Sequence, residues 1–424
     1  MAAETKQVSE DVRNGRIQPR TLKGFNDYLP EAAARRQWII ERLRHVFERW
    51  GYLPLETPTL EYADVLLGRY GAEAEKLIYR FQDFGGRDVA MRYDQTVPFA
   101  RVVAQYRQLP RPFRRYQIQR VWRGENTGRG REREFTQCDV DVAGVAGPLA
   151  DAETLAVAVA GFHAIGFKRV RVLVNDRTLF DDLGLSRGEI IAVDKLAKIG
   201  ADGVVRELVA AGRPEAAARD LLQRLREAPP SQRLQEVMAM AYDLGVAEED
   251  LQFDSTLARG LEYYTGVILE VTSPDYGAGS LGGGGRYDGL IRRFTGQDVP
   301  AVGFSFGLER VVEALEVVGA FADFRAAPAV VAIPLGRAQL GWAGQLAARL
   351  REAGIGVVMS LDPDAGAGKQ ISTAVKLGAA YAVLLGESEV AAKQATLKDL
   401  ASSQQQTLDV ETLIQRLSSL RMES

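Results

Sequence analysis

Two kinds of side chain alternate along residues 132–142, and this pattern constrains the fold more than any other feature of the chain. One set is polar apart from a single aromatic ring: Phe135, Gln137, Asp139 and Asp141. The other set is mainly apolar: Thr136, Cys138, Val140 and Val142. Successive side chains of a strand point to opposite faces of its sheet. Residues 132–142 are therefore predicted to form a strand with one face in the core and one polar face available for chemistry.

A second strand is predicted at residues 114–125, joined to the first by a glycine-rich, charged loop at residues 126–131. Gln117, Gln119 and Arg123 share one parity, which predicts a polar floor across the two strands. The region is also rich in arginine, whose guanidinium pairs well with phosphate oxygens. Its arginines are Arg107, Arg111, Arg114, Arg115, Arg120, Arg123, Arg129, Arg131 and Arg133. The residues alone allow either a phosphate-binding surface or a solvated basic face.

The chain has 424 residues, so we expect two or three domains rather than one. Residues 178–249 have helical spacing, broken near Gly212 and Pro229, which predicts an inserted helical module. After residue 326 strands alternate with helices, which predicts a separate parallel α/β domain.

The composition excludes several classes of protein. A lone cysteine, Cys138, cannot form an internal disulfide, and with only His45 and His163 beside it the chain lacks a ligand set for zinc. Because a single cysteine cannot form an internal disulfide, we expect a reducing compartment. The apolar runs are too short to span a membrane. The glycines at residues 282–285 lack the spacing of a dinucleotide-binding loop. The near balance of 53 basic and 56 acidic residues argues only weakly against a nucleic-acid partner.

Three segments resemble the motifs of class II aminoacyl-tRNA synthetases. GYLPLETP at residues 51–58 resembles motif 1, which forms the dimer in that class. RGE at residues 123–125 and REF at residues 133–135 resemble motif 2, and GFSFGLER at residues 303–310 resembles motif 3. These matches indicate the class without indicating the amino acid.

Two further segments resemble signatures of the histidyl-tRNA synthetases within that class. They are RGLEYYTG at residues 259–266 and GGRYDG at residues 284–289. Together with the three motifs they extend the resemblance over nearly the whole chain after residue 20. The chain is thus identified from its sequence as a member of the histidyl-tRNA synthetase family.

The resemblance implies an α/β (α+β) fold. Its core is the antiparallel sheet of class II synthetases, with a helical insertion and a C-terminal α/β anticodon-binding domain. We expect the first part of the core at residues 1–174, the insertion at residues 175–252, the second part of the core at residues 253–326 and the anticodon-binding domain at residues 327–424.

The resemblance also implies an activity and its partners. We expect a cytoplasmic homodimer that uses ATP, accompanied by Mg²⁺, to join L-histidine to tRNA(His) through a histidyl-adenylate intermediate, without a membrane partner. Direct metal ligands are not identified by the resemblance.

Three arginines are the expected catalytic residues, because attack of a carboxylate on the α-phosphorus of ATP needs fixed positive charge. By its motif 2 match, Arg123 is expected to hold the α-phosphate, and by its motif 3 match Arg310 the γ-phosphate. Arg259 is expected to contact the α-phosphate and the substrate carboxylate. Phe135 is expected to stack on adenine, and Glu125 to accept from the adenine amino group or to order the loop.

The remaining expected contacts hold histidine, which presents an ammonium, a carboxylate and an imidazole. RYDQT at residues 92–96 resembles the substrate loop of the family in the variant with aspartate. Asp94, Thr96 and Gln137 are expected to hold the ammonium. Asp141 and the hydroxyl of Tyr264 are expected to address the two ring nitrogens. The full expected set that contacts histidine is Asp94, Thr96, Arg123, Gln137, Asp141, Arg259, Tyr263 and Tyr264.

Two other readings compete with this one. A regulatory paralogue, such as the regulatory subunit of ATP phosphoribosyltransferase, senses histidine without charging tRNA, but such paralogues usually lose catalytic motif residues and the anticodon domain. This chain keeps Arg123, Arg259 and Arg310, and it keeps the C-terminal region. A class II synthetase for proline, threonine or glycine would leave the paired Tyr263 and Tyr264 unexplained.

Overall fold

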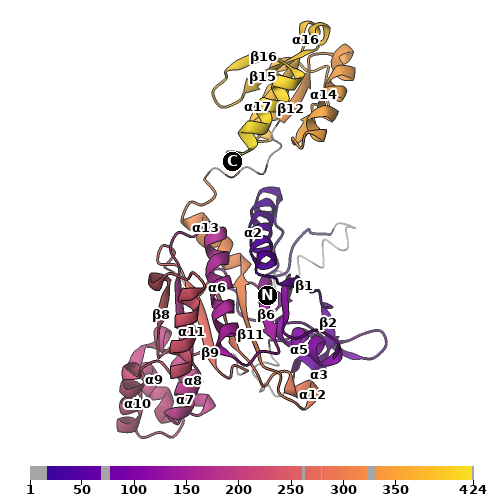
Figure 1. Cartoon of the computed structure of the whole chain (residues 1–424). Coiled ribbons are helices and arrows are strands. Elements are labelled where there is room, and N and C mark those ends of the chain that lie inside the picture. Colours follow the sequence, from indigo (N-terminus) through magenta and orange to yellow (C-terminus); the bar gives the residue numbers. More distant parts are fainter. Residues whose placement is uncertain are drawn as a thin grey trace. The chain divides into compact units, whose positions relative to one another are not determined.

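The computed structural model describes residues 17–67, 77–259, 263–277, 279–322, 324, 326 and 330–422. The chain forms two compact units (Figure 1). The larger unit contains Arg36–Ala320, and the smaller one contains Phe321–Ser424 together with Tyr28–Arg35.

The larger unit is built on an eight-stranded sheet that is antiparallel except at its two edges. In spatial order its strands are β1 (Leu53–Pro54), β5 (Phe113–Trp122), β6 (Glu134–Ala143), β11 (Ala301–Gly307), β10 (Gly282–Arg286), β9 (Val267–Thr272), β7 (Arg171–Asp176) and β8 (Leu251–Phe253). Strands β5 and β6 are the pair predicted from the sequence. The register places Gln117 opposite Asp139 and Gln119 opposite Gln137, so the two predicted polar rows lie side by side.

Helices cover the apolar face of this sheet. They are α2 (Pro30–Arg49), α6 (Pro148–Ala164), α11 (Gln232–Asp243) and α13 (Leu308–Val317). Figure 1 shows α6 and α11 lying side by side. Phe47 of α2 and Phe162 of α6 both contact Phe306 of β11, with ring centroids 5.8 and 4.7 Å apart. Cys138 and Val140 are fully buried on the same side, which confirms the predicted core face of β6.

A small three-stranded sheet lies beside the start of the polar floor. Its order is β2 (Leu60–Tyr62), β4 (Asp88–Met91) and β3 (Arg80–Gln82). Helix α3 (Ala63–Leu67) packs on this sheet, α5 (Thr96–Gln105) packs on α3, and α12 (Arg292–Thr295) packs on α5. Helix α5 matters most for the site, because Asp94, just before it, and Thr96, its first residue, line the cavity.

A group of helices is inserted between the neighbouring parallel strands β7 and β8 (Figure 1). Its members are α7 (Thr178–Asp182), α8 (Arg187–Asp194), α9 (Leu196–Ala210) and α10 (Glu215–Glu227), and the short turn η1 (Glu248–Asp250) follows α11. Leu208, Leu221 and Leu225 form part of the core that holds these helices together. The helical spacing read from residues 178–249 is thus confirmed.

The smaller unit has a five-stranded mixed sheet. In spatial order its strands are β13 (Val357–Met359), β12 (Val330–Pro334), β14 (Tyr381–Leu385), β15 (Gln394–Asp399) and β16 (Gln405–Asp409). Its helices are η2 (Arg337–Gln339), α14 (Leu340–Glu352), α15 (Ala367–Lys376), α16 (Glu387–Ala392) and α17 (Val410–Met422). The predicted parallel pairing is confirmed for β13, β12 and β14. Strands β15 and β16, which were not predicted, add an antiparallel part to the sheet, and the short polar turn between them leaves no room for a crossover helix.

Within the described part of the chain, no helix is both long enough and apolar enough to cross a lipid bilayer.

Candidate active site

A cavity of about 600 Å³ opens on the polar face of β6. It is lined by every residue that the sequence analysis assigned to the site: Asp94, Thr96, Arg123, Glu125, Phe135, Gln137, Asp141, Arg259, Tyr263, Tyr264 and Arg310. These residues come from segments more than two hundred positions apart in the sequence, and the sheet brings them together. A volume of this size is typical of small-molecule sites.

The glycine tract forms strand β10, which the sequence analysis did not predict to be a strand. The reason for glycine is the close approach of site side chains to the backbone of β10 and β11. A Cβ atom at Gly283 would lie 2.2 Å from Nη1 of Arg259, and one at Gly303 would lie 1.9 Å from Oδ1 of Asp141. Because Gly283 and Gly303 have no side chain, Arg259 and Asp141 can lie directly against the backbone of the sheet.

Asp141 is held by two residues that the sequence analysis missed. Its Oδ2 atom lies 2.6 Å from Nη2 of Arg115, and its Oδ1 atom accepts from the hydroxyl of Tyr287. Arg115 is fully buried, with its guanidinium 4.8 Å from the ring centre of Phe99. Burial raises the pKa of Asp141 to about 7, although Arg115 opposes this shift. Arg115 shares the parity of the polar floor, so its place on that face was open to prediction, whereas Tyr287 gave no such signal.

Asp94 lies at the start of α5 in the same cavity. Its Oδ1 atom accepts from the backbone N–H of Val97 at 3.1 Å, which fixes the side chain at the first turn of the helix. Burial raises the pKa of Asp94 to about 6. Burial thus disfavours the charged form of both carboxylates, and a cationic ligand would favour it.

Arg123 and Phe135 face each other across the two central strands. The Arg123 guanidinium lies 5.0 Å from the Phe135 ring centre, and its Nε donates to the carbonyl of Tyr93 at 2.9 Å. The predicted parity of Phe135 is confirmed, because the ring lines the cavity rather than the core.

Arg259 lies over β10 and is oriented by a carboxylate. Its Nη1 atom is 2.7 Å from Oε2 of Glu270 on β9. Asp194, at the end of insertion helix α8, also lines the cavity and interacts electrostatically with both residues. The residues that follow Arg259 in its signature, 260–262, lie outside the described residues.

Arg310 and Glu125 hold the loop between β5 and β6. Arg310 donates from Nε to the carbonyl of Gly130 at 3.1 Å and from Nη1 to the carbonyl of Ser280 at 2.9 Å. Glu125 forms an ion pair with Arg131. Both site residues are therefore engaged with the backbone or with the loop.

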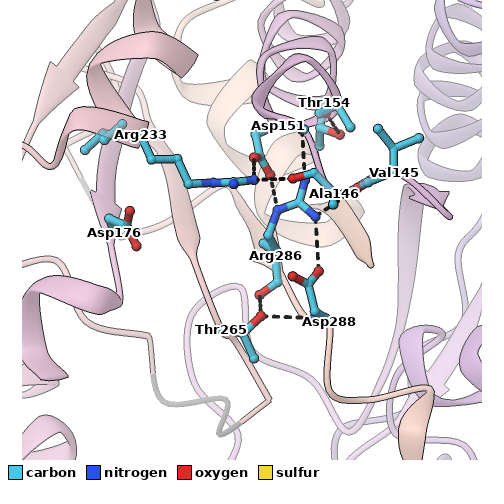
Figure 2. A network of polar contacts seen from close by, with 12 residues as sticks. Val145, Ala146, Asp151, Thr154, Asp176, Arg233, Thr265, Arg286 and Asp288 are labelled. Carbon is cyan, nitrogen blue, oxygen red and sulfur yellow. Dashed lines mark hydrogen bonds and ion pairs between the residues drawn. The ribbon is translucent and has the colours of Figure 1, made fainter. Parts of the chain in front are cut away.

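Arg286, from the second signature, lies at the centre of a buried polar network (Figure 2). Its Nε donates to Asp151 of α6 at 2.8 Å and its Nη1 to Asp288 at 3.1 Å, while its carbonyl accepts from Thr265 at 2.8 Å. Arg233 of α11 reaches the other oxygen of Asp151, also at 2.8 Å. The network ties the segment after Tyr264 and strand β10 to the helices behind the sheet.

No group of three or more histidine, cysteine, aspartate or glutamate side chains within the described residues is arranged to hold a metal ion.

Comparison with known proteins identifies the family of this site. The family description "Histidyl-tRNA synthetase" matches residues 24–311, and "Anticodon binding domain" matches residues 329–420. This chain belongs to the histidyl-tRNA synthetase family. This membership confirms the family that the signatures at residues 259–266 and 284–289 predicted.

Curated members of the histidyl-tRNA synthetase family align along most of their length. The histidine–tRNA ligase of Aeropyrum pernix is 39% identical, with 91% of this chain and 94% of that protein covered. The histidine–tRNA ligase of Rhodopirellula baltica is 38% identical, with 92% and 95% covered. The crystal structure of histidyl-tRNA synthetase from Nostoc sp. PCC 7120 matches with a TM-score of 0.83 at 29% identity, covering 95% of this chain and 100% of that one. The predicted fold class and the predicted enzyme class are confirmed.

Proposed function

We infer that this chain joins L-histidine to tRNA(His) in an ATP-dependent reaction that passes through histidyl-adenylate. The observation that carries this function is the convergence, in one cavity of a histidyl-tRNA synthetase fold, of three arginines with buried carboxylates. The arginines suit ATP and the substrate carboxylate, whereas the buried aspartates suit the cationic and N–H groups of histidine.

We propose that the three arginines act on the first step. The carboxylate of histidine attacks the α-phosphorus of ATP, a new C(O)O–P bond forms, and pyrophosphate leaves. In this proposal Arg123 and Arg259 stabilise the charge that grows on the α-phosphoryl oxygens, and Arg310 holds the γ-phosphate. Phe135 supplies a ring against which adenine stacks, beside Glu125. In the second step a ribose hydroxyl at the 3′ end of tRNA attacks the activated carbonyl, and AMP leaves.

We propose that the aspartates recognise histidine itself. Asp94, Thr96 and Gln137 hold the α-ammonium group. Asp141 accepts from one ring N–H, and the hydroxyl of Tyr264 addresses the other nitrogen, with Tyr263 packed edge-on against it at 4.9 Å. The ion pair with Arg115 and the hydrogen bond from Tyr287 support this role of Asp141, because they fix the carboxylate before substrate arrives.

Mg²⁺ is proposed to enter with ATP. The ion is usually bound by one or two carboxylates together with substrate phosphates and water. Asp194 and Glu270 fit this requirement, since both line the cavity and they interact electrostatically with each other. When bound, Mg²⁺ would supply charge neutralisation of the phosphates.

Charging of tRNA separates this function from that of a regulatory paralogue. The purified chain is incubated with ATP, Mg²⁺, labelled histidine and a tRNA(His) transcript, and labelled tRNA is measured after acid precipitation. We expect label to accumulate on tRNA(His) and not on a tRNA(Pro) transcript. A folded chain that binds histidine but never labels tRNA would support the regulatory paralogue instead.

The smaller unit is proposed to be the anticodon-binding domain at residues 327–424, with the catalytic core at residues 1–174 and 253–326 around the insertion at residues 175–252. Its match to the anticodon-binding family supports this division. Removing residues 328–424 should leave adenylate formation largely intact while tRNA charging falls strongly. Equal loss of both activities in a folded truncated protein would contradict the division.

A homodimer is proposed on the exposed apolar surface of the motif 1 region. Leu53 of β1 is 63% exposed and Tyr62 of β2 is 56% exposed, and Leu60 of β2 and Phe81 of β3 are exposed on the three-stranded sheet. Exposed apolar clusters of this kind mark interfaces. Sedimentation analysis should give a dimer, and Leu53→Glu should shift it towards monomer. We propose the cytoplasm as the compartment, where tRNA and ATP are available.

A further inference from the structure

Three residues that line the cavity each have a buried side-chain oxygen without a hydrogen-bond partner among the described residues. These oxygens are Oδ2 of Asp94, Oε1 of Gln137 and Oδ1 of Asp139. Buried polar atoms in folded proteins are almost always hydrogen-bonded, and an unsatisfied one is costly. All three atoms are acceptors, so the missing groups are N–H or O–H donors. An alkylammonium group supplies several N–H donors on one nitrogen and can therefore reach more than one of these acceptors.

Asp139 is the member of this set that has no role in the function described above. It is 2% exposed and lies on the polar face of β6, between Gln137 and Asp141. Its closest guanidinium is that of Arg115, whose Nη2 atom is 3.9 Å from Oδ2 and therefore outside hydrogen-bond distance. Burial raises the pKa of Asp139, against the opposing effects of Arg115 and of a hydrogen bond with Ser305.

No described neighbour of Asp139 forms a hydrogen bond with its Oδ1 atom. Arg115 directs the same Nη2 atom to Asp141 at 2.6 Å, and although its Nε and Nη1 lack acceptors among the described residues, Arg115 does not line the cavity. Gln137 donates from Nε2 to Oγ of Ser305 at 2.8 Å, and its amide oxygen is the atom left without a partner among the described residues. Asp141 differs from Asp139, because each of its oxygens already has one protein partner, Arg115 or Tyr287, and keeps only its second lone pair for a substrate.

We propose that Asp139 is a further substrate-binding residue, which accepts a hydrogen bond from the α-ammonium group of histidine beside Asp94 and Gln137. The proposal rests on the function inferred above and deepens it. Two carboxylates then face one ammonium, so the cavity discriminates against imidazole compounds that lack the amine. Such a compound leaves two buried carboxylates without a cation, and the cost of those unpaired groups is the source of specificity.

Two analogues of histidine separate a binding role of Asp139 from a structural one. Histidinol has the ammonium and the imidazole without the carboxylate, whereas 3-(imidazol-4-yl)propionate has the imidazole and the carboxylate without the ammonium. Binding of both to the full chain is measured by calorimetry for the unmodified protein, Asp139→Asn and Asp139→Ala. In both variants we expect histidinol affinity to fall on the order of ten- to a hundredfold, because the hydrogen bond between two charged groups is lost in Asp139→Ala and loses its charge on the acceptor in Asp139→Asn. Affinity for the propionate should stay within about twofold or rise, because the variants remove an unpaired charge.

Asp250→Asn is the matched control. Asp250 is a buried aspartate of the same unit that pairs with His163 at 3.0 Å and does not line the cavity, so this variant should bind both analogues normally. Equal losses for both analogues in Asp139→Asn, or unchanged histidinol affinity, would overturn the proposal and leave the proposed function intact. If the folded, unmodified chain bound neither histidine nor histidinol, both the role of Asp139 and the proposed function would be contradicted.

Discussion

Arg259 and Glu270 form an ion pair over the bare backbone of β10, with Nη1 of Arg259 2.7 Å from Oε2 of Glu270. Gly283 is the residue opposite Glu270 in the register of β9 and β10. A Cβ atom at Gly283 would lie 2.2 Å from the same Nη1 atom. The position of a proposed catalytic arginine therefore depends on the absence of a side chain at residue 283.

Gly283→Ala should impair adenylate formation because the new methyl group displaces the Arg259 guanidinium. Loss of one preorganised donor typically costs on the order of a hundred- to thousandfold in rate. The measurement is single-turnover formation of histidyl-adenylate. Gly289→Ala is the control, since a Cβ there meets nothing closer than 4.0 Å, and it should keep nearly full activity. Normal activity in folded Gly283→Ala would show that Arg259 has another position available.

Arg259→Ala should slow adenylate formation by roughly a hundred- to thousandfold, because a fixed guanidinium meets the growing phosphoryl charge without reorganisation. Arg259→Lys should recover only part of the rate, since a point charge cannot bridge a phosphate oxygen and the substrate carboxylate as a planar fork does. Transfer from preformed histidyl-adenylate to tRNA is measured separately and should be mostly spared. Near-normal activation by Arg259→Ala would rule this role out.

Asp141→Asn and Tyr264→Phe should weaken histidine binding by roughly ten- to a hundredfold while ATP binding changes little, because each variant removes a partner from a buried ring nitrogen. Equilibrium binding of histidine and of ATP is measured for each variant. Tyr242→Phe, on α11 and away from the cavity, is the control and should bind both normally. If both site variants keep their histidine affinity, the imidazole is bound elsewhere.

The raised pKa values of Asp94 and Asp141 predict how stability depends on pH in the absence of substrate. Their pKa values are about 6 and about 7, above the value of about 4 in an unfolded chain. A carboxyl with a raised pKa contributes stability that is complete below its unfolded pKa and is lost as the pH rises through its folded pKa. The melting temperature of Asp141→Asn minus that of the unmodified chain should therefore increase by a few degrees between pH 5 and pH 8. A constant or decreasing difference would contradict the buried, desolvated state of Asp141.

Much of the catalytic floor could be predicted because a strand has a strict period of two. The polar parity of residues 135 to 141 predicted which side chains line the cavity, and the structure confirms it. Arg115 and Tyr287 were not predicted as partners of Asp141, because the register between strands and the path of a distant loop are tertiary properties. The periodicity of one strand contains no information on either property.

Strand β10 and the C-terminal sheet show two other limits. Glycines carry no hydrophobic period and have low strand propensity, so Gly282–Arg286 gave no strand signal although every residue of it is buried. In the smaller unit, β15 and β16 are short and half polar, and nothing in their sequence fixed the antiparallel pairing. Contacts with neighbouring elements decide both structures.

Pyrophosphate exchange tests the central claim most directly, because it measures amino acid activation without tRNA. The full chain is incubated with ATP, Mg²⁺, labelled pyrophosphate and each of the twenty amino acids in turn, and labelled ATP is counted. We predict exchange with histidine well above that with every other amino acid, and its loss in Arg259→Ala. Exchange driven by proline or threonine, or no exchange with histidine in folded protein, would contradict the account.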